Sequence, residues 1–308
     1  MPALPPTGTS ALHHLKPQPQ NQKTPAKIPK LSPPIARVVT AVVLLPILIA
    51  SILIPRLDLL FVALAVATLV VALFEFWLLA KRQQVKADVG AGCLGAAAIL
   101  TIFYFTEPGK WIDFGMMQGV ILILTMGSLA AAMVRGAPFE KMIMSVGATV
   151  LGVLYVVLLG GHLIAVRLGF ESTLSRHLLA FFFLVIMSAD SAAYYAGRIF
   201  GRHKLAPSIS PGKTWEGVVG GLMISLLVAA LAHFWFFPEL PLKLALPVAA
   251  VMNLLSVIGD LTESALKRSV GAKDTANILP GHGGLLDRID SLLFNAPLIY
   301  YFARLYFK

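Results

Sequence analysis

Long apolar runs separated by short polar segments make up most of the chain. Most runs are close to the ~20 residues that a helix needs to cross the hydrocarbon of a bilayer. Strands of a membrane barrel would instead alternate apolar and polar residues over ~10 positions, a pattern that these runs do not show. The sequence therefore predicts an all-α, polytopic integral membrane protein with about nine transmembrane helices, at residues 38–54, 57–80, 89–105, 116–134, 142–166, 177–200, 215–237, 242–258 and 289–306.

The composition agrees with this class. Of the 308 residues, 57% are hydrophobic and only 13% are charged, and the mean hydropathy is +0.81. Because soluble domains carry about 25% charged residues, a soluble enzyme, a disordered chain, a collagen and a disulfide scaffold are excluded. The single cysteine, Cys93, can form neither an intrachain disulfide nor a thiolate metal site.

The distribution of cations predicts the orientation of the spans. When nine spans alternate, the side that holds the N-terminus collects more than twice as many Lys and Arg as the other side. Cytoplasmic segments of membrane proteins carry this excess, so we expect a cytoplasmic N-terminus and a C-terminus on the opposite side. The net charge of +10 then needs no nucleic-acid partner. The expected location is the cell inner membrane, or plasma membrane, as a multi-pass protein.

Three regions follow from these patterns. Residues 1–36 are Pro-rich and basic and contain no acid, which predicts a disordered cytoplasmic tail near anionic lipid headgroups. Residues 37–176 are expected to form the N-terminal transmembrane helices. Residues 177–308 are expected to form a C-terminal transmembrane region with two polar cytoplasmic loops, 201–214 and 259–288.

Acidic residues are few, so their positions are informative. Asp190 lies inside the predicted span 177–200, where an ionisable group indicates a functional site or, alternatively, an ion pair with an Arg of a neighbouring helix. Four polar residues after the span 242–258 recur at i, i+3, i+4 and i+7 and so share one helix face: Asp260, Glu263, Ser264 and Lys267.

The segment that precedes the last span combines acids, cations and glycines. Three glycines surround His282 and leave the backbone free to approach a ligand closely. Asp287 and Asp290 begin the last span, where a carboxylate could simply complement the helix dipole. Because that alternative leaves the glycines and Asp260 unexplained, we predict a phosphate site held by a hard metal ion.

The loop 201–214 is also basic and glycine-rich. Its Gly212-Lys213-Thr214 run looks like part of a P-loop, but Pro207 occupies the position of the first glycine, and we reject that motif. Cations and backbone N–H groups at a helix start can still bind phosphate. The histidines have neither the thiolates of a zinc site nor the context of a catalytic triad, so oxygen ligands and Mg²⁺ are favoured.

The residues between 264 and 290 resemble the C-terminal signature of the phosphatidate cytidylyltransferase (CDP-diglyceride synthetase) family. The matching positions are Ser264, Lys267, Arg268, Lys273, Asp274, His282, Gly283, Gly284, Asp287, Arg288 and Asp290. Residues 210–217 are similar to a second conserved loop of that family. The likeness covers roughly residues 180–295, while the N-terminal spans resemble the family only in hydropathy.

The resemblance implies a nucleotidyltransferase of phospholipid biosynthesis. CTP and phosphatidic acid would give CDP-diacylglycerol and pyrophosphate at the cytoplasmic face of the membrane, in a cavity open to membrane lipid, and the enzyme would be a homodimer with nine spans. It also implies Mg²⁺ held by Asp260 and Asp287 and leaves a second cation open. No nucleic acid is expected as a partner.

The residue roles follow from this resemblance and from the chemistry of phosphate. We expect Asp260 and Asp287 to bind the metal. The expected phosphate contacts are the cations Lys213, Lys267, Arg268, Lys273 and Arg288. Further substrate contacts are expected from Ser210, Glu216, Ser264, His282, Gly283 and Gly284. Supporting positions behind these residues are expected at Asp190, Asp274 and Asp290.

Two other functions stay open as alternatives. A CTP-dependent lipid kinase of the polyprenol type would need similar basic loops and a metal, but it would transfer the γ-phosphate to an alcohol. An ion-coupled transporter would use Asp190 and Asp260 to carry protons or Na⁺. Transporter sites tend to lie at the midplane between internal repeats, whereas these acids gather near one face.

Overall fold

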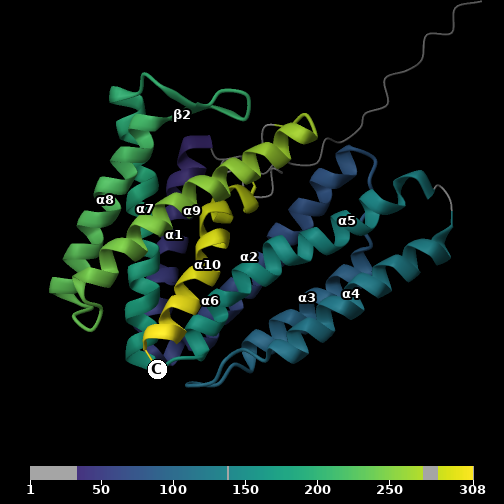
Figure 1. The fold of residues 1–308 in the computed structure, drawn as a ribbon, viewed down its shortest axis with the longest axis horizontal. Coiled ribbons are helices and arrows are strands. Elements are labelled where there is room, and N and C mark those ends of the chain that lie inside the picture. Colours follow the sequence, from purple (N-terminus) through teal and green to yellow (C-terminus); the bar gives the residue numbers. More distant parts are fainter. Residues whose placement is uncertain (1–32, 137–138, 273–283, 308) are drawn as a thin grey trace, which may run out of the picture.

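The computed structural model describes residues 33–136, 139–272 and 284–307. Nearly all of this part of the chain is helical, which confirms the all-α prediction (Figure 1). The helices are α1 (Pro33–Leu53), α2 (Asp58–Arg82), α3 (Val89–Tyr104), α4 (Phe114–Arg135), α5 (Met142–Gly152), α6 (Leu159–Leu168), α7 (Ser172–Phe200), α8 (Trp215–Trp235), α9 (Leu242–Ser269) and α10 (Leu286–Tyr306). Short 3₁₀ turns at Pro55–Leu57 and Phe139–Lys141 precede α2 and α5, and a π-helical segment, Val153–Leu158, joins α5 to α6.

Several of these helices are membrane spans by length and composition. Six stretches of the described residues are long and apolar enough to cross a bilayer: Pro55–Arg82, Phe114–Arg135, Phe139–Leu168, Ser172–Phe200, Trp215–Trp235 and Leu242–Ser269. Two shorter apolar helical stretches are Leu44–Leu53 and Val89–Tyr104. The protein is therefore a multi-pass membrane protein, whereas the count of nine spans and their orientation stay predictions.

Parts of the two predicted loops of the C-terminal region form regular secondary structure. Residues 201–214 contain an antiparallel hairpin of β1 (Lys204–Ala206) and β2 (Ser210–Thr214), in which Lys204 lies opposite Thr214. Helix α9 continues to Ser269, so the first part of the predicted loop 259–288 extends the span, as the spacing of its polar residues indicated. Residues 1–32, which hold most of the predicted tail, lie outside the described residues.

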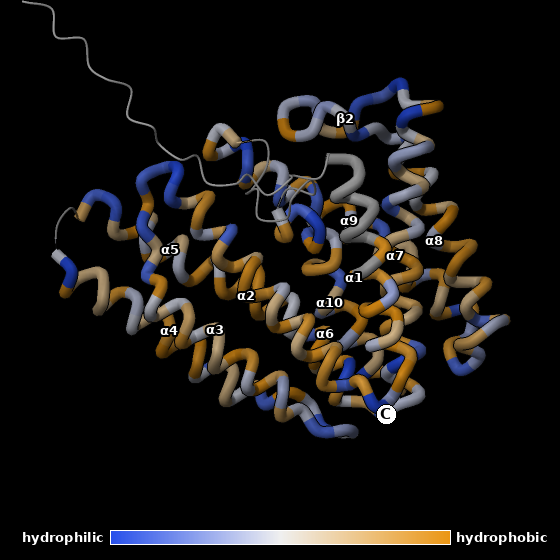
Figure 2. The backbone as a smooth tube through the Cα atoms, turned by 180° about the vertical axis from the view of Figure 1, so that it is seen from behind, coloured by the Kyte–Doolittle hydropathy of each residue, from blue (hydrophilic) through white to orange (hydrophobic). Residues whose placement is uncertain are grey.

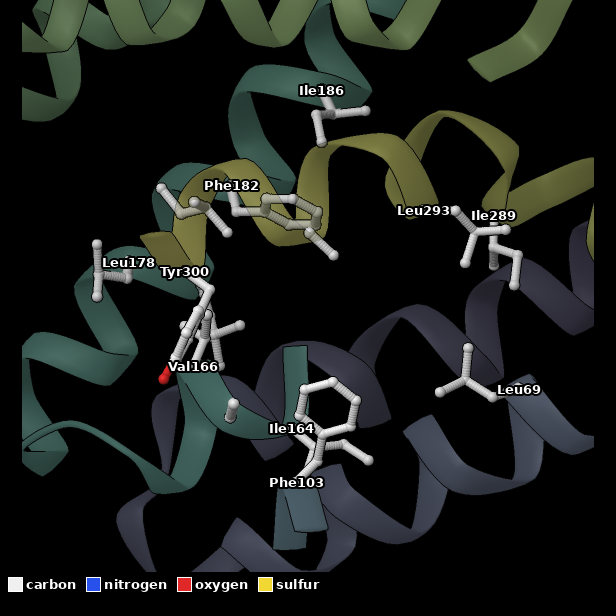
Figure 3. Close-up of a cluster of buried hydrophobic side chains, with 14 of the residues drawn as sticks. Leu69, Phe103, Ile164, Val166, Leu178, Phe182, Ile186, Ile289, Leu293 and Tyr300 are labelled. Atoms are coloured by element: carbon white, nitrogen blue, oxygen red, sulfur yellow. The ribbon is translucent and has the colours of Figure 1, made fainter. Parts of the chain in front are cut away.

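Helix α10 occupies the centre of the bundle. It contacts α9, α6, α2 and α7 (Figure 1). The core around it is built from large apolar side chains that are almost fully removed from solvent, among them Phe103, Ile164, Phe182, Leu293 and Tyr300 (Figure 3). Because α10 is surrounded, its polar residues can face protein rather than lipid.

The polar segments gather at the two ends of the bundle, with hydrophobic helices between them (Figure 2). At one end, Arg135 forms an ion pair with Asp88 at 3.0 Å, and Gln83 Nε2 donates to the Ser269 carbonyl at 3.1 Å. At the other end, Arg167 forms an ion pair with Asp58 at 2.5 Å. The loops near residues 83–88, 135 and 269, which the cation pattern assigns to one side, therefore share one end of the structure.

Small residues allow two pairs of helices to approach closely at the end of the bundle that carries the hairpin. A Cβ on Gly220 of α8 would lie 2.4 Å from Ala196 Cβ of α7, closer than two such atoms can approach. Small residues play this part in many membrane helix pairs. A Cβ on Gly259 of α9 would lie 2.5 Å from the Asp290 carbonyl oxygen of α10. The glycine before Asp260 thus permits the contact that brings the acids of α9 and α10 together.

We predict that Gly259→Ala pushes α9 and α10 apart. The added methyl group meets backbone, which cannot rotate away, so the free energy of unfolding should fall by about 1–3 kcal/mol. A lower midpoint of thermal unfolding in detergent would show this. The matched control is Gly127→Ala in α4, where a Cβ meets nothing within 4 Å and the midpoint should stay equal or rise. Equal midpoints for the two variants would contradict the prediction.

Candidate active site

A polar cavity opens at the end of the bundle that carries the hairpin. Its volume is about 770 Å³, and it lies between α7, β2, α8, α9 and α10. Its walls include four carboxylates, Asp190, Asp260, Asp287 and Asp290. The cations in its walls are Arg198, Lys204, Lys213 and Arg288. Acids and bases in one cavity of this size provide a site for a phosphate-bearing ligand and its counter-ion.

Two lysines pair with the carboxylates that we expected to bind metal. Lys213 Nζ of β2 forms an ion pair with Asp260 Oδ2 of α9. Lys267 Nζ lies 3.1 Å from Asp287 Oδ1 and 2.5 Å from Glu263 Oε2, so one ammonium group serves two carboxylates. Glu263 is almost completely buried, with 1% of its surface exposed. The Lys267 contacts therefore join α9 to the first turn of α10.

Asp190 and Asp290 belong to a polar strip that continues from the cavity into the bundle. The Ser291 hydroxyl donates to Asp190 Oδ2 at 3.1 Å, and the Ser291 N–H donates to Asp290 Oδ1 at 2.7 Å. Deeper, Asn295 Nδ2 donates to Ser256 Oγ at 3.0 Å. Asp190 thus bonds to a serine hydroxyl rather than to the arginine that the alternative interpretation required.

Two residues that were expected to contact substrate form hydrogen bonds to the hairpin. Glu216 Oε1 lies 2.7 Å from His203 Nδ1 and also accepts from the His203 N–H at 3.2 Å, which fixes the start of the hairpin to α8. Arg268 Nε donates to the Ile209 carbonyl at 3.2 Å and so holds the turn of the hairpin against α9. Both side chains hold the hairpin in place beside the cavity.

The predicted residues divide into three groups. Those in the cavity wall are Asp190, Ser210, Lys213, Asp260, Asp287, Arg288 and Asp290. Those that the structure describes outside the wall are Glu216, Ser264, Lys267, Arg268 and Gly284. Those that lie outside the described residues are Lys273, Asp274, His282 and Gly283.

Some residues of this region were not selected from the sequence. Asn253 and Ser256 line the cavity and extend the polar face of α9 by about two turns before Asp260. Their spacing from Asp260 is the i, i+3/i+4, i+7 pattern, so the same argument could have found them. Glu75 of α2 also bonds to the first turn of α10. In the sequence, Glu75 could have been found as an acidic residue inside the apolar run 57–80.

The cavity offers oxygen ligands for a metal ion but no complete cage. Among the described residues no three or more His, Cys, Asp or Glu side chains form a group that could hold a metal. Asp260 of α9 and Asp287 of α10 supply two carboxylates to the same cavity. Mg²⁺ commonly binds through one or two carboxylates together with substrate phosphates and water. The donor set fits an ion that a polyphosphate ligand helps to hold.

Comparison with known proteins gives the family. The sequence pattern of the cytidylyltransferase family matches residues 35–306, which is most of the chain. The chain belongs to the cytidylyltransferase family. The match includes the N-terminal helices, where sequence reasoning found only a likeness in hydropathy. The resemblance noted for the C-terminal residues is confirmed, and the chain is a nucleotidyltransferase.

Individual cytidylyltransferases show how far the similarity extends. A phosphatidate cytidylyltransferase of Staphylococcus epidermidis is 33% identical over 244 residues, which covers 75% of this chain and 88% of the relative. One of Bacillus subtilis is 34% identical over 248 residues, 77% of this chain and 86% of the relative. One of Haemophilus influenzae is 48% identical over 133 residues, 41% of this chain and 45% of the relative.

We predict that Lys267→Met strongly destabilises the protein. It leaves Glu263 and Asp287 facing each other without their shared cation, and removing one partner of a buried pair costs about 3–5 kcal/mol. Thermal unfolding in detergent measures the effect. Adding Glu263→Gln should recover part of the loss because one uncompensated carboxylate is removed.

The matched control for Lys267→Met is Lys110→Met at the opposite end of the bundle. Lys110 pairs with Glu107 on an exposed surface, so its replacement should cost less than ~1 kcal/mol. If Lys267→Met lost no more stability than this control, the contacts of Lys267 with Glu263 and Asp287 would contribute no more than an exposed ion pair.

Proposed function

We propose that this cytidylyltransferase transfers CMP from CTP to phosphatidic acid, giving CDP-diacylglycerol and pyrophosphate. The observation that carries the proposal is the cavity whose walls combine Lys213, Arg288, Asp260 and Asp287 at one end of a transmembrane bundle. A phosphate-bearing lipid and a triphosphate both need cations and a counter-ion site there. The names of the similar proteins, phosphatidate cytidylyltransferases, support the same substrates.

The reaction joins two polyanions, so charge is its main obstacle. An oxygen of the lipid phosphate attacks the α-phosphorus of CTP, a new P–O bond forms, and the bond to the β-phosphate oxygen breaks. Pyrophosphate leaves with the bonding electrons. The lipid phosphate is a monoester and already anionic near neutral pH, so no strong general base is needed. Positioning and charge neutralisation then provide the catalysis.

The residues of the cavity have separate parts in this scheme. Lys213 and Arg288 bind phosphate oxygens of the two substrates, and Ser210 and the backbone of β2 orient them. Asp260 and Asp287 would hold a magnesium ion together with the triphosphate. When bound, that ion supplies positive charge to the phosphates. Lys267 keeps Asp287 ionised and in place through the 3.1 Å contact.

The membrane arrangement is part of the proposal. The cavity and the hairpin face the cytoplasm, because the loops at that end are the ones with the excess of Lys and Arg. Phosphatidic acid enters from the bilayer, since apolar and aromatic residues such as Tyr194, Val218 and Val257 also line the cavity. The inner or plasma membrane location and the homodimer implied by the family resemblance stay predictions.

The assay for this function follows a label into lipid. Detergent micelles with phosphatidic acid, Mg²⁺ and α-labelled CTP should yield labelled CDP-diacylglycerol with the wild-type protein. Asp287→Asn should reduce the rate by at least about 100-fold, because it weakens the hold on the metal ion that would stabilise the developing charge on the phosphates. Asp113→Asn makes the same chemical change at the N-cap of α4 and should leave the rate unchanged.

The alternatives give different results in the same assay. Label from γ-labelled CTP in a lipid alcohol would favour the lipid kinase. Failure of both labels to enter lipid would overturn the proposed activity and leave the transporter. Full activity of Asp287→Asn would keep the reaction but contradict the assignment of Asp287.

The cytoplasmic orientation has its own test. In a Cys93→Ser background we introduce Ser208→Cys in the exposed turn of the hairpin or Lys110→Cys at the opposite end. A membrane-impermeant maleimide added to intact cells should label Lys110→Cys only, and permeabilised cells should show labelling at both. Labelling of Ser208→Cys in intact cells would reverse the predicted topology.

A further inference from the structure

One carboxylate in the N-terminal half of the chain lies outside the cavity wall and bonds to the start of α10, which carries two residues of that wall. Glu75 lies in α2 between Phe74 and Phe76, and its exposed fraction is 0%. Glu75 Oε1 accepts a hydrogen bond from the Leu285 N–H at 2.9 Å, and Oε2 accepts one from the Leu286 N–H at 2.7 Å. Both donors belong to the start of α10, more than 200 residues later in the chain.

The start of α10 needs an acceptor from elsewhere. The first N–H groups of a helix have no partner within the helix, and leaving them buried and unpaired is costly. Leu285, at the N-cap position, forms no capping hydrogen bond with its side chain. Asp287 Oδ2 accepts from the Gly284 N–H at 3.1 Å, and Glu75 supplies acceptors for the next two N–H groups. Its negative charge also complements the helix dipole.

The residues held in this way are next to the proposed chemistry. Leu286 precedes Asp287 and Arg288, and both of these line the cavity. A displacement of the first turn of α10 would move the Asp287 carboxylate away from Lys267 and change the distance between the carboxylates of α9 and α10. An ionisable group is expensive at a buried position in a membrane helix, so a structural gain must offset that cost.

We propose that Glu75 is a positioning residue of the active site, which anchors the first turn of α10 so that Asp287 and Arg288 face the cavity. This inference rests on the proposed function for the parts that Asp287 and Arg288 play. The anchoring itself rests on the two hydrogen bonds. A purely stabilising Glu75 would affect only the folded fraction, whereas a positioning Glu75 also affects the activity of each folded molecule.

The variants that test this are Glu75→Gln, Glu75→Asp and a matched control. Glu75→Gln keeps the size but turns one acceptor into a donor, which faces an N–H group and cannot accept from it. Glu75→Asp keeps the charge on a shorter side chain. Asp58→Asn makes the same change of carboxylate to amide in the same helix, about 25 Å away at 1.5 Å per residue, where Asp58 pairs with Arg167.

Two measurements are made on the full-length protein in detergent. Hydrogen exchange followed by mass spectrometry reports the protection of the amides at residues 284–288. The CMP-transfer assay, corrected for the folded fraction, reports kcat and KM. In Glu75→Gln we expect about tenfold faster exchange at 284–288 and at least about a tenfold lower kcat, because a buried hydrogen bond is lost. Glu75→Asp should recover part of both, and Asp58→Asn should change neither.

Each other outcome overturns part of the inference. Unchanged exchange at 284–288 in Glu75→Gln would refute the anchoring, whatever the activity. Faster exchange with wild-type kcat would refute the positioning. If Glu75→Gln does not fold, Glu75→Asp decides by the same two criteria. If the wild type has no CMP-transfer activity, the proposed function fails, while the exchange measurement still decides whether Glu75 anchors α10.

Discussion

The shared contact of Lys267 with Glu263 and Asp287 is the interaction on which the site depends. In a bundle surrounded by hydrocarbon, an acidic side chain needs a partner of opposite charge or a hydrogen-bond donor. Lys267 serves both carboxylates and in doing so joins α9 to α10. Lys213 pairs with Asp260 and so joins the hairpin to α9. Asp260 and Asp287 are therefore held in place by lysines before any substrate is bound.

Close helix packing makes these contacts geometrically possible. Gly220 lets α8 approach α7, and Gly259 lets α9 approach α10. The Glu216–His203 and Arg268–Ile209 contacts then hold the hairpin beside the cavity. Small residues and polar anchors thus act together. The small residues set the distances between helices, and the anchors place the loop that carries Lys213.

Hydropathy and charge spacing predict the class of fold and the four carboxylates of the cavity wall. The apolar runs place the helices, and the helical spacing of Asp260, Glu263 and Lys267 correctly predicts a common face. The hydrogen-bond and ion-pair partners of polar side chains are harder to predict from the sequence, because they come from elements far apart in the chain. Arg268 was expected to contact phosphate and bonds to the Ile209 carbonyl, and Glu216 was expected to contact substrate and bonds to His203.

The central position of α10 also has a consequence for how the protein is made. Helix α10 contacts α2, α6, α7 and α9, and all four precede it in the chain. Until α10 is synthesised, Lys267 of α9 has Glu263 as a partner but lacks Asp287, the carboxylate that joins α9 to α10. Helix α10, which follows its four neighbours in the chain, therefore completes both the apolar core and the charged contact between α9 and α10.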